Sequence, residues 1–438
     1  MQQLSSITKT LILTGFSALS LFAIAPAQAA SFRGLGDYIV HDPFLWGGSR
    51  DYYNIRANEV SADGSVVVGS IERDYYIENE TVAFRWTQAD GINIIATGNS
   101  GSPYRPPFSS AYRVSDDGSV VIGTSWNEGY RYGTGYSSSF QWTQNLGLTE
   151  NFPVAYPNDM SANGSVFVES VPGQNYYDPF PRPPFPPYDP YKAYRWTQET
   201  GRVPLGNLGN NSLDTLASAV SADGSVIVGL SGNANGHEEA FRWTQETGMM
   251  GLGFLTNDID INANGNSKAN EVSADGSVVI GSSRGAYGGD KAFRWTQETG
   301  MMDLGSLDPN VASSTAKDVS ADGSIVVGDS YNVNSNKEAF RWTQETGMVS
   351  LKETLIGKGL DVSGWILDEA TGISADGFTI VGNGINPSGQ REGWVANLSP
   401  EPVPEPLTIL GSIAAIGFAA SFERKFNKNK SDEKYPED

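Results

Sequence analysis

The sequence predicts an all-β fold: a seven-bladed β-propeller built from four-stranded antiparallel blades. Two repeated segments carry this prediction. A segment of the form Val-Ser-Ala-Asp-Gly-Ser-Val-Val-Val-Gly occurs seven times between residues 60 and 382, and an Ala-Phe-Arg-Trp-Thr-Gln segment or a variant of it follows each copy. No helical periodicity competes between residues 32 and 398. Units of about 50 residues that each hold four short strands are typical of propeller blades.

Each unit is expected to contain strands joined by tight turns. The first strand ends in Val-Ser, and an Asp-Gly pair follows it (Asn-Gly at 163–164). Both residues of such a pair tolerate positive φ, so the pair predicts a hairpin turn. The second strand is a continuous apolar run, as in strands that are buried on both faces. Ala-Phe-Arg-Trp-Thr forms the third strand, and Met-x-x-Leu-Gly, after a Gln-Glu-Thr-Gly turn, forms the fourth.

The two ends of the repeat region predict how the ring closes. Residues 32–36 match the fourth-strand Leu-Gly element but precede the first repeat, whereas the seventh repeat ends after its third strand, near Leu398. The N-terminal piece is therefore expected to supply the missing strand of the last blade, which would remove both open sheet edges. An open β-solenoid or a row of sandwiches is the alternative, and an elongated scattering profile would favour it.

The Ala-Phe-x-Trp segments resemble the HAF repeat family of extracellular bacterial proteins. The resemblance covers residues 32–398, but the histidine that gives the family its name is absent. In the best copies that position holds Val82, Glu239, Lys291 and Glu338. The resemblance implies an extracellular location and a repeat architecture, and it implies no chemistry.

Three segments divide the chain: a signal peptide at 1–29, the propeller at 30–398 and a sorting signal at 399–438. The first contains Lys9, an apolar run from Leu11 to about Ala25, and the small-x-small cleavage pattern of residues 27–29. This order is typical of secretory signal peptides. An uncleaved membrane helix is the alternative.

The C-terminal segment combines three features in a fixed order. Pro404, Glu405 and Pro406 precede a hydrophobic helix predicted at 407–422, and a basic cluster at 424–430 begins with Arg424 and Lys425. By the positive-inside rule, the basic cluster would lie on the cytoplasmic side of a membrane. A plain C-terminal membrane anchor would have the same features.

This ordered triple strongly resembles the PEP-CTERM sorting signal of Gram-negative bacteria. The resemblance implies an exosortase-type processing enzyme as a partner. It also implies transient anchoring in the inner membrane by the C-terminal helix. The mature protein would then be exported to the cell surface, outer envelope or extracellular matrix.

Composition excludes several classes of function. The chain has 50 acidic and 29 basic residues and a net charge of −21, so nucleic acid is not an expected partner. It contains no cysteine, which excludes disulfides and thiolate chemistry, and its two histidines disfavour Ser-His-Asp catalysis. The sequence also lacks a nucleophile elbow, a phosphate-binding loop and a cofactor fingerprint. We therefore expect that the protein is not an enzyme.

Tyrosine-rich loops are the first candidate ligand site. The connections from second to third strand and from fourth to first strand differ between units and fall on one face, where binding residues often gather. Aromatic rings with polar neighbours suit sugar binding, although the same rings could simply pack the loops against the propeller. The candidate residues are Tyr75, Tyr76, Tyr130, Tyr132, Tyr176, Tyr177 and Tyr188.

A calcium loop is the second candidate. Residues 260–271 fit the twelve-residue pattern D-x-[DN]-x-[DN]-G-x5-E, whose alternate oxygen ligands suit Ca²⁺. An ordinary Asn-rich turn is the alternative, because the last residue of the pattern occupies the strand position that Glu59 holds in the first unit. The candidate ligands are Asp258, Asp260, Asn262, Asn264 and Glu271.

These observations together predict an exported, non-catalytic surface or matrix protein. It would present its variable-loop face to polysaccharide or to another surface protein. The alternative is a propeller enzyme that acts on extracellular polysaccharide, a glycoside hydrolase or lyase. Such an enzyme would need paired carboxylates, for which no diagnostic spacing exists in the sequence.

Overall fold

The computed structural model describes most of the region predicted to form the propeller. The described residues are 30–36, 53–73, 80–97, 108–128, 135–150, 154, 157–173, 189–255, 265–284, 289–311 and 313–399. No helix in these ranges is long and apolar enough to cross a membrane. The predicted signal peptide and the predicted helix at 407–422 lie outside them.

Antiparallel sheets make up almost all of this region, which confirms the all-β fold class. Strands that follow one another in sequence pair within each sheet. One four-stranded sheet contains β10 (Pro157–Met160), β11 (Val166–Val171), β12 (Lys192–Thr197) and β13 (Gly201–Pro204). A second contains β14 (Thr215–Val220), β15 (Val226–Gly232), β16 (Glu238–Thr244) and β17 (Gly248–Gly251). The next two contain β18 (Ser267–Val272), β19 (Val278–Arg284), β20 (Asp290–Thr296) and β21 (Gly300–Asp303), then β22 (Ser314–Val319), β23 (Ile325–Tyr331), β24 (Lys337–Thr343) and β25 (Gly347–Ser350).

An eight-stranded sheet holds the first two units. Its strands are β2 (Tyr53–Val60), β3 (Val66–Arg73), β4 (Glu80–Thr87), β5 (Gly91–Ala96), β6 (Phe108–Val114), β7 (Val120–Glu128), β8 (Gly135–Thr143) and β9 (Gly147–Glu150). The two halves, β2–β5 and β6–β9, are each antiparallel. One parallel pairing, Thr81 with Phe108, joins them.

The last sheet contains both ends of the repeat region. It consists of β26 (Ile366–Ile373), β27 (Thr379–Ile385), β28 (Arg391–Asn397) and β1 (Ser31–Gly34). The register of β1 on β28 runs from Ser31 opposite Asn397 to Gly34 opposite Trp394. The prediction that the N-terminal piece completes the last sheet is therefore confirmed.

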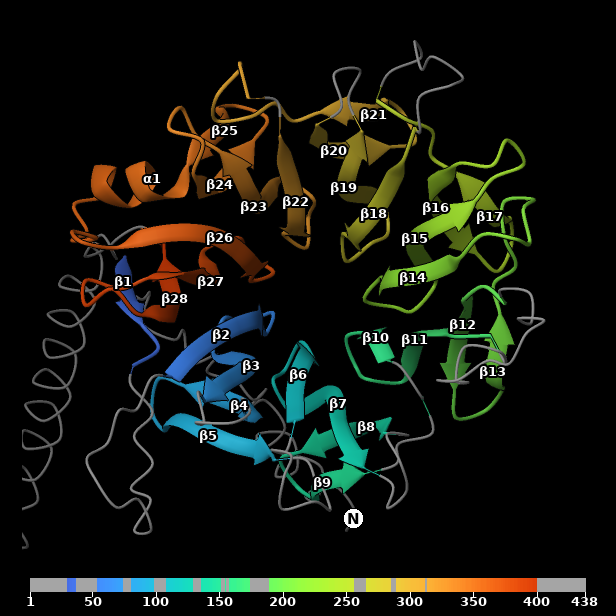
Figure 1. Ribbon diagram of the computed structural model, residues 1–438, viewed down its shortest axis with the longest axis horizontal. Helices are drawn as coiled ribbons and strands as arrows, with labels where there is room; N and C mark the ends of the chain where they lie inside the picture. The colour runs from blue at the N-terminus through green and yellow to red at the C-terminus, as the bar shows by residue number, and fades with distance from the viewer. Residues whose placement is uncertain are drawn as a thin grey trace, which may run out of the picture. The chain divides into compact units, whose positions relative to one another are not determined.

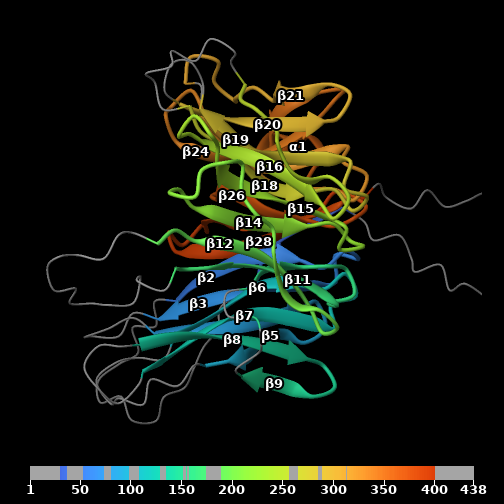
Figure 2. The ribbon, with the colours of Figure 1, turned by 90° about the vertical axis from the view of Figure 1, so that its right-hand side faces the viewer.

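The sheets of residues 30–398 surround a central axis, with the first strand of each unit innermost (Figure 1). In the perpendicular view of Figure 2 the strands run along this axis. Backbone hydrogen bonds link the turns of neighbouring sheets around it. The N–H of Ala162 donates to Ala222 at 3.0 Å, and the series continues until Ala375 donates to Ala62 of the first unit at 2.9 Å. The last sheet is thus bonded to the first.

The turn after each first strand explains why its sequence recurs. The Ser61 hydroxyl donates to Asp63 Oδ1 at 2.6 Å, and the same carboxylate oxygen accepts the N–H of Ser65 at 2.9 Å. Gly64 has a φ of 73°, a conformation that favours glycine. The N–H of Val66 donates back to the Ser61 hydroxyl at 3.0 Å. The equivalent turn glycines with positive φ are Gly118, Gly164, Gly224, Gly276, Gly323 and Gly377.

The second strands form the core, as their apolar sequences predict. In β19 the residues from Val278 to Gly281 are all buried. A Cβ on Gly281 would lie 2.0 Å from the carbonyl oxygen of Lys268 in β18 and 2.9 Å from the ring of Phe293 in β20. Glycine at this position therefore lets the first and third strands close around the second.

Arginines of the third strands connect one sheet to the next. Three of these guanidinium groups donate through Nε to the carbonyl of a turn glycine in the following sheet, whereas the buried Nε atoms of Arg85 and Arg341 have no hydrogen-bond partner among the described residues. The pairs are Arg195 with Gly224 at 3.3 Å, Arg242 with Gly276 at 3.2 Å, and Arg294 with Gly323 at 3.1 Å. The arginine of the repeated Ala-Phe-Arg-Trp-Thr segment thus fastens neighbouring sheets.

One helix corrects the expectation that no helix forms between 32 and 398. Helix α1 (Leu351–Gly357) follows β25, and the Ser350 side chain caps it by accepting the N–H of Glu353 at 3.2 Å. Leu351 and Leu355, four residues apart, are both fully buried. The segment is too short for periodicity to predict it, and packing of these leucines against the last two sheets stabilises it.

Candidate functional site

A β-bulge near the end of each first strand turns side chains towards the axis. In β2, Ala57 pairs with Gly69 and Glu59 with Val68, so Asn58 is an extra residue in the ladder. Bulges re-aim side chains and often lie beside functional sites. The corresponding extra residues are Tyr112, Asn158, Ser218, Asn270, Lys317 and Thr371.

The residues that follow the bulge form a cluster of charges around one arginine. Arg113 lies 3.3 Å from Glu59 through Nη1, 3.3 Å from Asp159 through Nε, and 3.0 Å from Glu271 through Nη2. Asp318 follows the bulge of β22 in the same way, and its carboxylate accepts the N–H of Ile373 at 2.7 Å. We call Glu59, Arg113, Asp159, Glu271 and Asp318 the axial charge cluster. Its carboxyl groups outnumber its single guanidinium.

Burial controls the protonation of this cluster. Desolvation raises the pKa of Glu59 to about 8 and the pKa of Asp318 to about 6. It also raises the pKa of Glu271 well above the ordinary range. Burial by itself lowers the pKa of Arg113, but the surrounding carboxylates outweigh this effect and hold it well above its usual value. Arg113 therefore stays charged at neutral pH, while Glu59 keeps its proton.

Three of the bulge residues are asparagines whose side chains bind the first strand of the next unit. The Nδ2 group of Asn58 donates to the carbonyl of Ala111 at 2.7 Å. Asn158 donates to Ala217 at 2.6 Å, and Asn270 donates to Ala316 at 2.8 Å. These bonds fix the orientation of each amide. The carbonyl oxygen of each side chain is left facing away from the bonded sheet.

A cavity of about 670 Å³ opens on the axis beside the bulge residues. It lies within the size range of sites for small molecules. Tyr191 is the aromatic residue of its lining, which is otherwise mostly polar. The lining residues are Arg113, Asn158, Ser170, Tyr191, Asp214, Leu216, Ala217, Ser218, Lys268, Asn270, Thr315 and Lys317.

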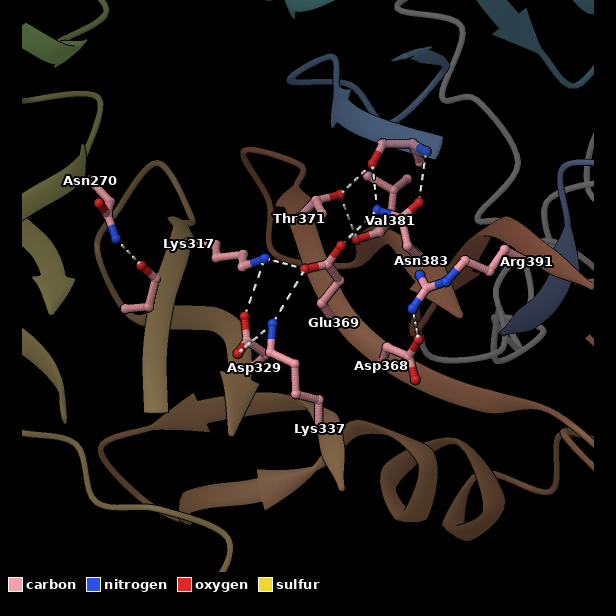
Figure 3. A network of polar contacts seen from close by, with 12 residues as sticks. Asn270, Lys317, Asp329, Lys337, Asp368, Glu369, Thr371, Val381, Asn383 and Arg391 are labelled. Atoms are coloured by element: carbon pink, nitrogen blue, oxygen red, sulfur yellow. Dashed lines mark hydrogen bonds and ion pairs between the residues drawn. The ribbon is translucent and has the colours of Figure 1, made fainter. Parts of the chain in front are cut away.

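Lys317 is neutralised by a network that crosses three sheets (Figure 3). Its Nζ lies 3.1 Å from Asp329 and also contacts Glu369. Lys337 approaches the second oxygen of Asp329 at 3.2 Å. Asn383 donates to Glu369 at 3.1 Å and to the carbonyl of Ala57 in β2 at 3.1 Å. The network therefore ties the last sheet to both of its neighbours.

Lys268 differs from the other cations of the cavity. It lies on β18 with an exposed side chain, and it has no ion-pair partner among the residues that the structure describes. Desolvation lowers the pKa of its ammonium group. Arg113 and Lys317, in contrast, each contact at least two carboxylates. Lys268 is thus the cation that is left for an anionic ligand.

The opposite side of the axial charge cluster faces a second, smaller hollow of about 120 Å³. Its charged lining residues are all acidic: Glu59, Asp116, Asp159, Glu271 and Asp318. The two hollows therefore differ in charge. The larger one is lined by the cations Arg113, Lys268 and Lys317 and by the carboxylate of Asp214, whereas every charged residue that lines the smaller one is acidic.

Most predicted site residues fall outside the described part of the chain. This holds for every candidate tyrosine, for Asp258, Asp260, Asn262 and Asn264, and for the sorting residues Pro404, Glu405, Pro406, Arg424 and Lys425. Glu271 is described: it belongs to β18, and its carboxyl group contacts Arg113 of β6. In the described ranges no group of three or more acidic or histidine side chains is arranged to hold a metal ion.

The glutamates that precede two of the Ala-Phe-Arg-Trp segments have a structural role. Glu239 accepts the side-chain N–H of Asn233 at 2.8 Å and the backbone N–H of Gly253 at 3.0 Å. Glu338 accepts from Asn332 at 2.8 Å in the same way. These carboxylates hold the turn between the second and third strands, which is far in sequence from the bulge residues of the same unit.

Sequence reasoning missed Arg113, Lys268 and Lys317. A signal for the charge cluster was present, because charged residues directly precede the apolar end of the first strand in five units. These residues are Glu59, Arg113, Asp159, Glu271 and Asp318. A charge at the end of a buried strand is unusual and marks a position with a special environment.

Comparison with known proteins supports the fold alone. No family model and no curated protein matches the chain. The β-propeller domain of the Trilobed protease from Pyrococcus furiosus matches with a TM-score of 0.51 and 11% identity, over 81% of this chain and 98% of that one. A structure from a study of two prolyl endopeptidases matches with a TM-score of 0.50 and 10% identity, over 80% and 50%.

A third match is the uncomplexed acylaminoacyl peptidase of Pyrococcus horikoshii, with a TM-score of 0.50, 10% identity and coverage of 79% and 51%. The chain thus spans about half the length of the two whole peptidases that it matches. At these identities the likeness establishes a propeller fold.

The predicted function is corrected by these findings. The chain was expected to be a non-catalytic surface or matrix protein that presents variable loops to polysaccharide or protein, or else a polysaccharide-degrading enzyme. That prediction is wrong: the propellers that share its fold are described as parts of peptidases. The cavity of about 670 Å³ lies beside the first-strand bulges and not among the predicted tyrosine-rich loops, and Tyr191 is the aromatic residue of its lining.

Proposed function

We propose that this chain is a ligand-binding propeller module whose site is the axial cavity beside Lys268. The observation that carries the proposal is an ammonium group without an ion-pair partner among the described residues, at a cavity of about 670 Å³. The whole chain has a net charge of −21, so an unpaired cation is a favourable place for an anion on an otherwise acidic protein. The ligand is a small anion.

Peptides are the ligand class to test first. The structural neighbours of this chain are described as peptidases, and the chain corresponds to about half of two of them. The chain binds such a ligand without turning it over. In support of this, the sequence contains two histidines and no cysteine, and it lacks a nucleophile elbow.

A thermal-shift experiment on the full-length chain tests the proposal. The probes are acetate, inorganic phosphate, glucuronate and N-acetyl-trialanine. A ligand at 100 times its Kd should raise the free energy of unfolding by about 2.7 kcal/mol. Ser218→Trp, which fills the cavity, should abolish the shift, whereas Ser388→Trp at an exposed turn should leave it intact. A shift that survives Ser218→Trp would place binding elsewhere and refute the axial site.

We also propose that the ring has seven blades, with the eight-stranded sheet counted as two. The supporting observation is that its halves are four-stranded, antiparallel and joined by the single pairing of Thr81 with Phe108. Phe108→Pro would remove the N–H of the first residue of β6, a position at which a strand tolerates proline. A seven-bladed ring should keep its thermal midpoint within about 2 °C after this change, whereas a continuous sheet should lose more.

Export and sorting remain a proposal from the sequence. The order of a signal peptide at 1–29 and the triple of Pro-Glu-Pro, apolar segment and basic cluster at 404–430 supports it. Mass spectrometry of the mature protein from a producing cell should find an N-terminus near residue 30 and a C-terminus near residue 404. Recovery of the intact chain from the cytoplasm would refute it.

A further inference from the structure

We propose that the axial cavity recognises the C-terminal carboxylate of a peptide together with the backbone N–H that precedes it. This inference rests on the proposed binding function and specifies its ligand. It is carried by two kinds of group that line the same cavity: an ammonium group without an ion-pair partner among the described residues, and two amide oxygens whose Nδ2 groups are bonded to the protein.

The ammonium group and the first acceptor come from the same strand. Lys268 and Asn270 are two residues apart on β18, and both line the cavity. Asn270 is the bulge residue of this strand, and the bulge brings its side chain to the same cavity as that of Lys268. A ligand group that contacts the ammonium group is therefore within reach of the asparagine.

The asparagine amides present acceptor oxygens to the cavity. Asn270 uses Nδ2 to donate to Ala316 at 2.8 Å, and Asn158 uses Nδ2 to donate to Ser170 at 2.8 Å and to Ala217 at 2.6 Å. These inter-sheet bonds determine which end of each amide faces the cavity. Neither Oδ1 atom accepts a hydrogen bond from a described residue, so both can receive an N–H from a ligand.

The C-terminal residue of a peptide matches this arrangement, because it carries both a carboxylate with a single negative charge and a backbone N–H donor. Inorganic phosphate matches it less well. Phosphate sites usually provide several donors, whereas the amide oxygens would repel phosphate oxygens. The remaining cations do not change this conclusion, since Arg113 and Lys317 are engaged by carboxylates.

Isothermal titration calorimetry on the full-length chain tests the inference with a matched pair of peptides. N-acetyl-trialanine has a free carboxylate, and its C-terminal amide differs from it only in that group. The amide should bind at least tenfold more weakly. Lys268→Gln should weaken the acid by a similar factor and leave the amide unchanged. Lys358→Gln removes an exposed lysine beyond α1 and is the control, for which both affinities should equal those of the wild-type chain.

The outcomes separate this inference from the proposed function. Equal binding of acid and amide, or displacement of the peptide by equimolar acetate, would overturn the terminal-carboxylate assignment and leave the binding module in place. Binding of phosphate or glucuronate at the Ser218 site without peptide binding would do the same. Failure of all four probes to bind would overturn the proposed function as well.

Discussion

The axial charge cluster makes the stability of this protein depend on pH in a direction that can be calculated. The pKa of Glu59 rises from 4.5 to about 8 on folding because its carboxyl group is buried. Because this pKa is raised on folding, Glu59 does not reduce the free energy of unfolding below pH 4.5. Above pH 4.5 its ionisation in the unfolded chain lowers that free energy progressively, until the pH exceeds 8. Each pH unit within this window costs about 1.4 kcal/mol. Between pH 6 and pH 8 the loss from this one group is about 2–3 kcal/mol.

Glu59→Gln isolates this contribution. Glutamine has the shape of the protonated glutamate, and its Oε1 can still accept from Arg113, which lies 3.3 Å from Glu59 in the wild-type chain. The variant should therefore become more stable than the wild type by about 2–3 kcal/mol as the pH rises from 6 to 8. For a chain of this size the difference corresponds to about 3 °C in the thermal midpoint.

Thermal or urea unfolding followed by tryptophan fluorescence, at half-unit steps between pH 5 and pH 9, measures the effect. Glu298→Gln, in an exposed turn of the Gln-Glu-Thr-Gly type, is the matched control and should follow the wild-type curve. Glu271 and Asp318 titrate in all three proteins, so their contributions largely cancel in the comparison. Parallel curves for Glu59→Gln and the wild type would show that the cluster is hydrated, and the reasoning from burial would be wrong.

Three further changes test the packing of the ring by urea unfolding. Arg242→Met removes two hydrogen bonds to the carbonyl of Gly276 and should cost about 2 kcal/mol; an unchanged midpoint would mean that these bonds do not fasten the sheets. Gly281→Ala places a Cβ 2.0 Å from a backbone oxygen and should cost about 3 kcal/mol or prevent folding, whereas a neutral effect would contradict the close approach of β18. Phe32→Ala removes the ring that packs edge-on against Trp365 at 5.3 Å. It should cost about 2 kcal/mol and expose β1 to proteolysis, and a protected N-terminus would argue against closure through this strand.

The repeat pattern was sufficient to predict the architecture. Asp-Gly pairs specify hairpins locally, because the Asp63 carboxylate and the positive φ of Gly64 complete the turn within a few residues. Continuous apolar second strands require sheets on both sides. The Leu-Gly element at 32–36 precedes the first repeat, and the seventh repeat lacks a fourth strand. The pairing of the N-terminal piece with β28 could therefore be predicted from the number of strands in each unit.

Helix α1 shows where local pattern was insufficient. Its seven residues carry only two apolar positions that face the core, Leu351 and Leu355. A helix of this length is marginal by itself, and its stability comes from the sheets against which it packs. That environment exists only after the last two units have come together.

The candidate site depended entirely on tertiary structure. Period-two alternation tells which residues of a strand share a face, but the bulge at Asn58 and its equivalents shifts that alternation near the axis. Arg113 and Glu271 are separated by 158 residues, and only the closed ring brings them within 3.0 Å. In the same way, nothing in the sequence distinguishes Lys268 from a surface lysine, and only the folded ring places it at a cavity without an ion-pair partner among the described residues.

The sequence by itself therefore determined the fold class, the repeating turns and the strand that completes the last sheet, because each of these follows from interactions a few residues apart or from the repeat count. The ring decided which first-strand residues meet on the axis, which carboxyl groups lose their water and which lysine is left without a partner. Those properties depend on distances between units, and no local pattern encodes them.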